Sequence, residues 1–137
     1  MRAVRNTDEG ARVVRVPEPE AAGDSTDNVL VDVVSTAICG SDPHMVTAGM
    51  AGATLGHAFA GTLADGTPVA VRPQAPCGAC DLCTSGHRQW CRTGGERLYG
   101  VTLDGGMADR VVVDASSPSN TPAQVARWDS WGRSGLP

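Results

Sequence analysis

Four of the chain's five cysteines lie close together in the segment PCGACDLCTSGHRQWC. Two overlapping Cys-x2-Cys spacings, a glycine at Gly86 and a fourth cysteine eight residues after the third allow one loop to place four sulfur atoms around a tetrahedron. Zinc fits such a site best, because it accepts four thiolates at about 2.3 Å and has no redox chemistry. We predict a closed structural zinc site, with no open coordination position, formed by Cys77, Cys80, Cys83 and Cys91. The alternative is four reduced cysteines that are neighbours by chance.

A second cluster of polar residues reads ICGSDPH from Ile38 to His44 and is followed by LGHAF around His57. A thiol and an imidazole from two different elements are the kind of ligands that hold zinc with a coordination position left open. Cys39 and His57 are therefore candidate ligands of a second zinc. The alternative interpretation is that these two residues bind nothing.

Composition limits the classes of function. At 137 residues the chain is long enough for one domain with its own core. A formal charge of −4 and the lack of a basic run argue against nucleic acid and anionic membranes as partners. No apolar stretch approaches the roughly 18 residues of a membrane span, and no signal-peptide core follows the first residues. An odd number of cysteines, four of them with metal-type spacing, agrees with a reducing compartment, so we expect a cytoplasmic protein.

The apolar pattern predicts a mainly β fold. Segments rich in valine or bounded by Pro, Gly, Asp or Asn predict strands at 11–16, 29–34, 59–63, 69–72 and 108–113. Asp65-Gly66 and Asp104-Gly105-Gly106 are typical of hairpin turns between such strands.

One short helix is predicted over residues 41–48. Ser41 or Asp42 is available to cap its first turn, and Gly49 is placed to end it. No Gly-x-Gly-x-x-Gly motif follows any strand, so the sequence contains no recognisable dinucleotide-binding Rossmann unit. These features together describe a small barrel-like domain with an inserted metal lobe.

The motifs Cys-Gly-Ser-Asp-x-His, Gly-His and Pro-Cys-Gly-x-Cys-x2-Cys-x2-Gly occur in this order. In this respect the chain resembles the zinc-dependent medium-chain alcohol and polyol dehydrogenases over residues 1 to about 115. The resemblance implies a GroES-like catalytic domain at 1–115, a mainly β barrel with short helices. Its inserted structural zinc lobe, residues 77–95, is called the cysteine lobe below.

The resemblance also implies roles for individual residues. Cys39 and His57 would ligate a catalytic zinc, and Asp42 would orient His57 from behind. Ser41 would pass the proton of the substrate hydroxyl through the cofactor ribose toward His44. Zinc with an open position lowers the pKa of a bound alcohol, and hydride then needs an acceptor, which in this family is NAD or NADP. The implied substrate is a small alcohol or polyol.

The chain departs from the family pattern in three respects. Ala58 stands where the family has Glu after the ligand histidine, and an outer partner of this kind is typically worth about 10- to 100-fold in metal affinity or activity. No residue after the cysteine lobe is a candidate for the third zinc ligand. The Rossmann cofactor domain has no counterpart. We therefore expect one structural zinc, a weak second site, and a fragment that is inactive alone.

Two other hypotheses remain open from the sequence. The chain could be half of a split dehydrogenase whose cofactor domain is a separate polypeptide. It could instead be a zinc-stabilised binding module that reuses the substrate cleft. Association into a homo-oligomer is compatible with each.

Residues 116–137 differ from the rest in composition. They are rich in Ser, Pro and Gly, have no helical period, and contain two of the three tryptophans, Trp128 and Trp131. We expect an irregular, disordered tail there, and interpret it as a frameshift or premature end in a dehydrogenase gene.

Three further residues have less specific interpretations. His87 is expected on the surface of the cysteine lobe, and Trp90 is expected to pack within it. His44 is either the relay base or a solvated helix residue.

Overall fold

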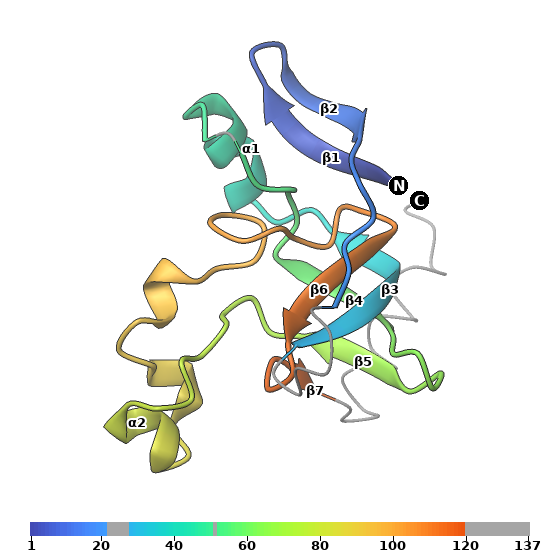
Figure 1. Ribbon diagram of the computed structural model, residues 1–137. Coiled ribbons are helices and arrows are strands. Elements are labelled where there is room, and N and C mark those ends of the chain that lie inside the picture. The colour runs from blue at the N-terminus through green and yellow to red at the C-terminus, as the bar shows by residue number, and fades with distance from the viewer. Residues whose placement is uncertain (22–27, 51, 120–137) are drawn as a thin grey trace, which may run out of the picture.

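The computed structural model describes residues 1–21, 28–50 and 52–119 and is mainly β with two short α-helices (Figure 1). The fold class predicted from the sequence is thus confirmed. The elements in chain order are β1 (Arg2–Thr7), β2 (Gly10–Arg15), β3 (Asn28–Ala37), α1 (Ser41–Thr47), β4 (Ala58–Thr62), β5 (Pro68–Val71), α2 (Asp81–Thr84), the 3-10 turns η1 (Arg88–Trp90) and η2 (Gly94–Glu96), β6 (Arg110–Asp114) and β7 (Pro118–Ser119). No helix in the described ranges is long and apolar enough to cross a membrane.

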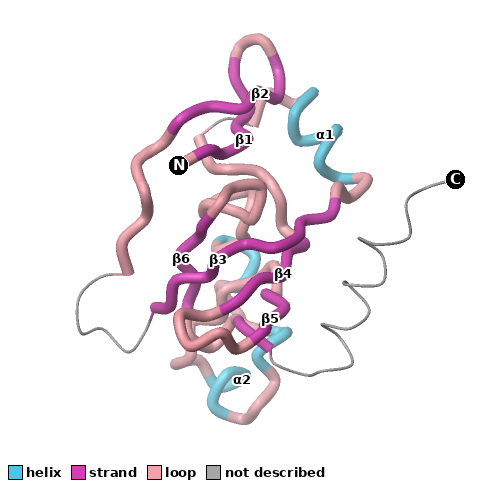
Figure 2. Tube along the Cα trace, turned by 90° about the vertical axis from the view of Figure 1, so that its right-hand side faces the viewer, coloured by secondary structure: helices cyan, strands magenta, loops and turns pink. Residues whose placement is uncertain are grey.

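The strands form two antiparallel sheets. β1 and β2 make a hairpin, and the remaining strands form a five-stranded sheet in the order β6-β3-β4-β5-β7, which curls through half a barrel. The hairpin and α1 lie at one end of the molecule, and α2 lies at the opposite end (Figure 2). The sheet therefore separates the two sequence clusters that were singled out for metal binding.

All five predicted strands are present as β2 to β6, with ends shifted by a few residues. The sequence missed β1, because its polar residues do not alternate with apolar ones as a half-buried strand would. It also missed β7, which pairs with β5. Ser117 is fully buried, so the sheet continues past residue 115, where an irregular tail was expected to begin. The rest of that tail, 120–137 with Trp128 and Trp131, lies outside the described residues.

The core lies inside the curled sheet. The chain's single phenylalanine, Phe59 of β4, meets its single tyrosine, Tyr99, edge to face with ring centroids 6.2 Å apart. The Tyr99 hydroxyl accepts a hydrogen bond from the Asp114 backbone N–H at 2.8 Å and lies 3.3 Å from the Ser117 hydroxyl. Valines of β3, β5 and β6 complete the buried cluster: Val31, Val69, Val71, Val111 and Val113.

The two predicted hairpin turns have different outcomes. Gly66 has a φ of +82° and lies in the turn between the paired strands β4 and β5, as predicted. Asp104-Gly105-Gly106 is not a hairpin turn, since the strand that follows it, β6, pairs with β3 instead. Gly105 N–H donates to Thr54 O and Gly106 N–H donates to Gly56 O, both at 2.8 Å. This glycine pair serves close packing against a distant segment of the chain.

The start of helix α1 differs from its prediction, whereas its end agrees with it. The N-cap is Gly40, and no side chain caps the first turn, so the prediction of Ser41 or Asp42 as cap is wrong. Gly49 ends the helix as predicted, with a φ of +70°. Met50 N–H donates to Met45 O and Gly49 N–H donates to Val46 O, the two bonds of a Schellman motif.

The cysteine lobe hangs from the sheet on two paired arms. Ala75 N–H donates to Arg97 O and Tyr99 N–H donates to Pro73 O, each at 2.9 Å. Gln74 forms an isolated antiparallel bridge with Leu98 between them. These bonds close the base of the lobe, so it can project from the domain without loosening the core (Figure 1).

Gly61 of β4 provides a test of the packing between β3 and β4. A Cβ at this position would overlap the Asp32 carbonyl oxygen and lie 2.7 Å from Val31 Cγ1. Gly61→Ala is expected to destabilise the domain by about 1–3 kcal/mol, because the two strands would have to separate locally. Urea unfolding followed by circular dichroism measures the change.

Gly95→Ala is the matched control, because a Cβ there meets no atom within 4 Å and the backbone has no positive φ. Its effect should stay within about 0.5 kcal/mol. Equal stabilities for the two variants would contradict the close β3–β4 contact.

Candidate metal centres

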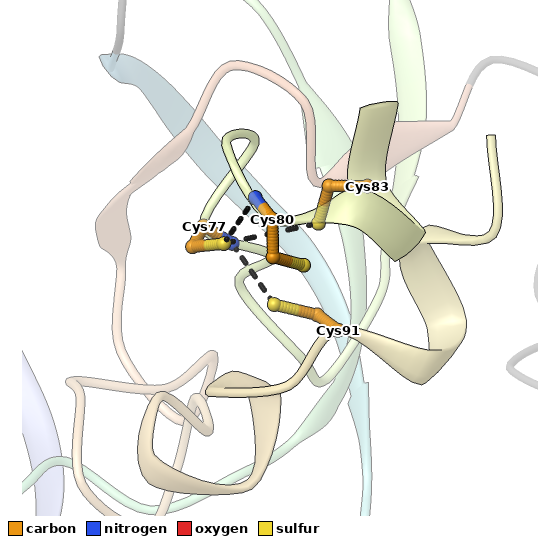
Figure 3. A group of neighbouring side chains, drawn as sticks. All are labelled: Cys77, Cys80, Cys83 and Cys91. Carbon is orange, nitrogen blue, oxygen red and sulfur yellow. Dashed lines mark hydrogen bonds between the residues drawn. The ribbon is translucent and has the colours of Figure 1, made fainter. Parts of the chain in front are cut away.

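Four cysteines converge in the cysteine lobe, as the sequence predicted. The Sγ atoms of Cys77, Cys80, Cys83 and Cys91 all lie within 4.8 Å of one another (Figure 3). Cys77 and Cys83 Sγ are 3.9 Å apart, close to the edge of about 3.8 Å that a tetrahedron of Zn–S bonds near 2.3 Å requires. Within the described part of the chain, this is the one group of three or more His, Cys, Asp or Glu placed to hold a metal ion.

Local structure aims the four sulfurs at a common point. Cys77 and Cys80 lie in the turn that leads into α2, Cys83 lies on that helix, and Cys91 follows η1. Backbone N–H groups point at the sulfurs: Cys77 N lies 3.2 Å from Cys91 Sγ, and Cys80 N lies 3.4 Å from Cys77 Sγ. Donors of this kind stabilise thiolates, the form that binds metal.

The environment separates the pKa values of these thiols. The Cys77 backbone N–H lowers the pKa of Cys91 to about 6, and the Arg92 backbone N–H lowers the pKa of Cys80. Burial raises the pKa of Cys83 to about 12. A metal ion at this centre would therefore have to displace the proton of Cys83, while Cys91 would already be ionised at neutral pH. All four donors are sulfur, which fits zinc and leaves no position for a substrate.

Two aromatic residues lie on the outside of the lobe. Trp90 is 64% exposed, so the prediction that it packs within the lobe is wrong. Its ring stacks on His87 with centroids 5.6 Å apart and planes 1° from parallel. His87 is exposed, as predicted, and its Nδ1 lies 3.2 Å from the Ser85 hydroxyl.

The second cluster forms where β3 and β4 end together. Ala37 of β3 pairs with Ala58 of β4, so Cys39, just after β3, and His57, just before β4, emerge at the same edge of the sheet. The His57 ring is near enough to the Cys39 thiol to help lower its pKa. The antiparallel register thus brings together the two residues that the sequence had paired.

Asp42 connects these two residues from behind. Its carboxylate is buried; Oδ2 accepts the Cys39 backbone N–H at 2.6 Å, and Oδ1 lies 3.3 Å from His57 Nδ1. Neither Asp42 Oδ1 nor His57 Nδ1 has another polar partner. With Nδ1 facing the carboxylate, the other ring nitrogen of His57 is left to act as a ligand, which is how carboxylates orient metal-binding histidines.

The reactive groups of this cluster face solvent. Cys39 is exposed, and hydrogen bonds from Ser41, followed by one from His57, lower its pKa to about 7. Ser41 and His44 are exposed and three residues apart on α1, hence on one face of the helix. Ala58 offers no carboxylate, so two protein ligands, Cys39 and His57, are available here among the described residues.

The sequence did not predict the contacts that hold residues 54–56, the segment directly before His57. Segment 54–56 contacts both β1 and segment 105–107: Leu55 N–H donates to Val4 O at 2.9 Å, and Met107 N–H donates to Leu55 O at 2.8 Å. Thr54 N–H donates to Asp104 Oδ1 at 2.7 Å. The sequence signal was the Asp104-Gly105-Gly106 run, which resembles a turn when read locally.

The comparisons with known proteins agree with this arrangement. The family model described as "Alcohol dehydrogenase GroES-like domain" matches residues 25–123. The scyllo-inosose 3-dehydrogenase of Thermotoga maritima is 30% identical over 131 residues, which cover 76% of this chain and 32% of that protein. The sorbitol dehydrogenase of Bombyx mori is 32% identical over 97 residues, or 58% of this chain and 27% of that protein.

Solved structures resemble the fold closely. The galactitol-1-phosphate dehydrogenase of Escherichia coli superimposes with a TM-score of 0.72 at 32% identity, covering 87% of this chain and 37% of that one. A cobalt- and zinc-bound alcohol dehydrogenase from Pyrobaculum aerophilum gives a TM-score of 0.76 at 26% identity, covering 91% and 42%. The chain thus spans less than half the length of each of these relatives. By fold, motif order and family match, it belongs to the alcohol dehydrogenase GroES-like domain family, the N-terminal domain of medium-chain alcohol and polyol dehydrogenases.

Proposed function

We propose that these residues form the zinc-binding catalytic domain of an NAD(P)-dependent medium-chain dehydrogenase acting on a small alcohol or polyol. The observation that carries the metal-binding part is the convergence of four Sγ atoms within 4.8 Å in the cysteine lobe. Zinc held there has a structural role, since four sulfurs fill its coordination shell. Metal content of the purified chain, measured by mass spectrometry, tests the proposal directly.

The substrate side of the proposal rests on the Cys39 cluster. Cys39 and His57 would hold a catalytic zinc, and Asp42 would fix the orientation of the imidazole ring through its contact with Nδ1. Zinc with an open position supplies the acidity that turns a bound alcohol into an alkoxide. Ser41, which lies with His44 on one exposed face of α1, would pass the released proton toward His44.

A split enzyme is a second candidate, favoured by the apolar surface beside this cluster. Val34 and Ile38 are 69% and 78% exposed, and they line a groove of about 450 Å³ together with Val13, Met107 and Ala108. Large apolar side chains gathered beside candidate catalytic residues favour a surface that another polypeptide covers. A cofactor-binding chain would complete the active site from that side.

Removing the metal should open the cysteine lobe alone. Zinc binding by four thiolates is coupled to folding of such loops with a free energy on the order of 10 kcal/mol. Chelation, or Cys83→Ser, is therefore expected to expose residues 77–95 to protease while the sheet stays folded. Limited proteolysis with mass spectrometry of the fragments locates the cuts. Cys39→Ser, which removes the thiol outside the lobe, is the control and should cut like wild type; resistance of 77–95 after chelation would refute the coupling.

Purified protein should carry one tightly bound zinc per chain. The lobe offers four thiolates from one contiguous loop, whereas Cys39 and His57 offer two ligands and would have to complete the shell with water. Cys39→Ala should leave the zinc content unchanged after dialysis against a mild chelator, and Cys83→Ser should lower it. Ala58→Glu should strengthen the second site only modestly, because it adds no ligand. Two zincs that survive dialysis, one of them lost with Cys39→Ala, would show an intact catalytic centre.

The 137-residue chain by itself should neither bind the dinucleotide tightly nor oxidise alcohols. Its sequence has no Gly-x-Gly-x-x-Gly motif for binding a pyrophosphate, so the Kd for NAD or NADP should be about millimolar or weaker. Calorimetric titration and absorbance of the reduced nicotinamide measure binding and turnover. Turnover above background that disappears in Cys39→Ala would mean that the chain is a complete enzyme.

A further inference from the structure

An ion pair spans the two halves of the cysteine lobe, and both its members directly follow a cysteine of the cluster. Asp81 follows Cys80, and Arg92 follows Cys91. Arg92 Nε lies 2.6 Å from Asp81 Oδ1, and Arg92 Nη2 lies 2.7 Å from Asp81 Oδ2. Two short parallel bonds between a guanidinium and a carboxylate fix both the distance and the orientation of the groups.

A main-chain contact joins the same two halves of the lobe. The Cys77 N–H donates to Cys91 Sγ at 3.2 Å. The segment that carries Cys91 is therefore joined to the segment that carries Cys77, Cys80 and Cys83 by the Asp81–Arg92 ion pair and by this hydrogen bond.

The connection matters because Cys91 is the ligand most distant along the chain. Cys77, Cys80 and Cys83 are consecutive in one turn and α2, whereas residues 84–90 separate Cys83 from Cys91. Release of a metal ion from such a site would begin at the ligand whose segment of chain can move away most easily from the other three. Of the four cysteines, Cys91 is separated from the others by the longest stretch of chain, and the Asp81–Arg92 ion pair joins its segment to the segment that carries Cys80.

The charges of the two residues predict that losing Arg92 has a larger effect on the site than losing Asp81. Four thiolates around one Zn²⁺ have a formal charge of −2, and Asp81 places a further carboxylate one residue from a ligand. Arg92 neutralises that carboxylate. Without Arg92, the negative charge of Asp81 would face the thiolates uncompensated, whereas without Asp81 the guanidinium would still attract them.

We propose that Asp81 and Arg92 are positioning residues that hold the Cys91 arm closed and slow the release of zinc from the four-cysteine site. This inference rests on the proposed zinc occupancy of that site. Both side chains are more than half exposed, at 62% and 64%, so the pair contributes little to global stability. Its effect is expected in the rate at which the metal leaves.

The test is the rate of zinc release into excess 4-(2-pyridylazo)resorcinol, followed by absorbance, for protein loaded with one zinc per chain. Arg92→Gln is expected to release zinc about two- to fivefold faster than wild type, and Asp81→Asn to accelerate release less. The charge swap, Asp81→Arg with Arg92→Asp, should return the rate toward wild type. Arg88→Gln is the control, because Arg88 is an exposed arginine of the same lobe without an ion pair among the described residues.

The outcomes separate the inference from the proposal beneath it. Wild-type release by Arg92→Gln, or equal acceleration by Arg88→Gln, would overturn the inference while zinc binding itself stands. Wild-type protein without zinc at the four cysteines would overturn both. If Arg92→Gln fails to load zinc, Arg92→Lys replaces it, because lysine keeps the positive charge but cannot make two parallel hydrogen bonds to Asp81. A wild-type rate of zinc release for Arg92→Lys would also contradict the inference.

Discussion

The close backbone packing of Gly56, Gly100 and Gly105 is the constraint that fixes where His57 and the cysteine lobe attach to the rest of the domain. A Cβ on Gly100 would lie 2.7 Å from the carbonyl carbon of Gly56, and one on Gly105 would lie 2.6 Å from Gly100 Cα. Any larger residue would force these segments apart. Gly56 directly precedes His57, and Gly100 directly follows Tyr99. Tyr99 pairs with Pro73 at the base of the cysteine lobe and contacts Phe59 in the core, so it connects the lobe to the core. One backbone contact therefore sets the place of the imidazole and of the lobe's attachment.

The two centres place different demands on the fold. The four cysteines come from one short contiguous loop, so little chain entropy opposes their convergence and the site depends mainly on its own turn and helix. Cys39 and His57 meet because β3 and β4 pair with Ala37 opposite Ala58. A shift of one residue in that register would turn the flanking side chains to the opposite face. The first centre is local, whereas the second is a product of the whole sheet.

This difference explains how much of the molecule the sequence could predict. The cysteine cluster and the strands β2 to β6 were predictable because spacing and valine content are local signals. β1 was missed because its partners, β2 on one side and residues 55 and 107 on the other, are recognised only in the folded chain. The run Asp104-Gly105-Gly106 was misread for the same reason, since a glycine needed for close approach looks like a glycine needed for a turn.

The grouping of reactive side chains was easier to predict from the sequence than the contacts that individual side chains make. The grouping of Cys39, Asp42 and His57 could be expected from motif order, but the cap of α1 could not. Asp42 turns from the helix to the Cys39 N–H and the His57 ring, because a buried carboxylate gains more from two converging partners than from one N–H of the first turn. The Trp90 ring lies on the exposed surface of the lobe, stacked on His87, which its apolar character did not predict.

The Cys39 cluster has exposed reactive groups on a buried support. Cys39, Ser41 and His44 face solvent, while Asp42, Thr54 and Asn6 behind them are buried. The Asn6 side-chain amide donates to Val46 O at 3.1 Å and Met50 O at 3.2 Å, so β1 holds the C-terminal end of the helix that carries Ser41 and His44. A few exposed groups can act with a defined geometry only where the residues behind them are held in place by such contacts. The buried residues behind the cluster, rather than the number of ligands at the surface, therefore determine how its exposed groups are placed relative to one another.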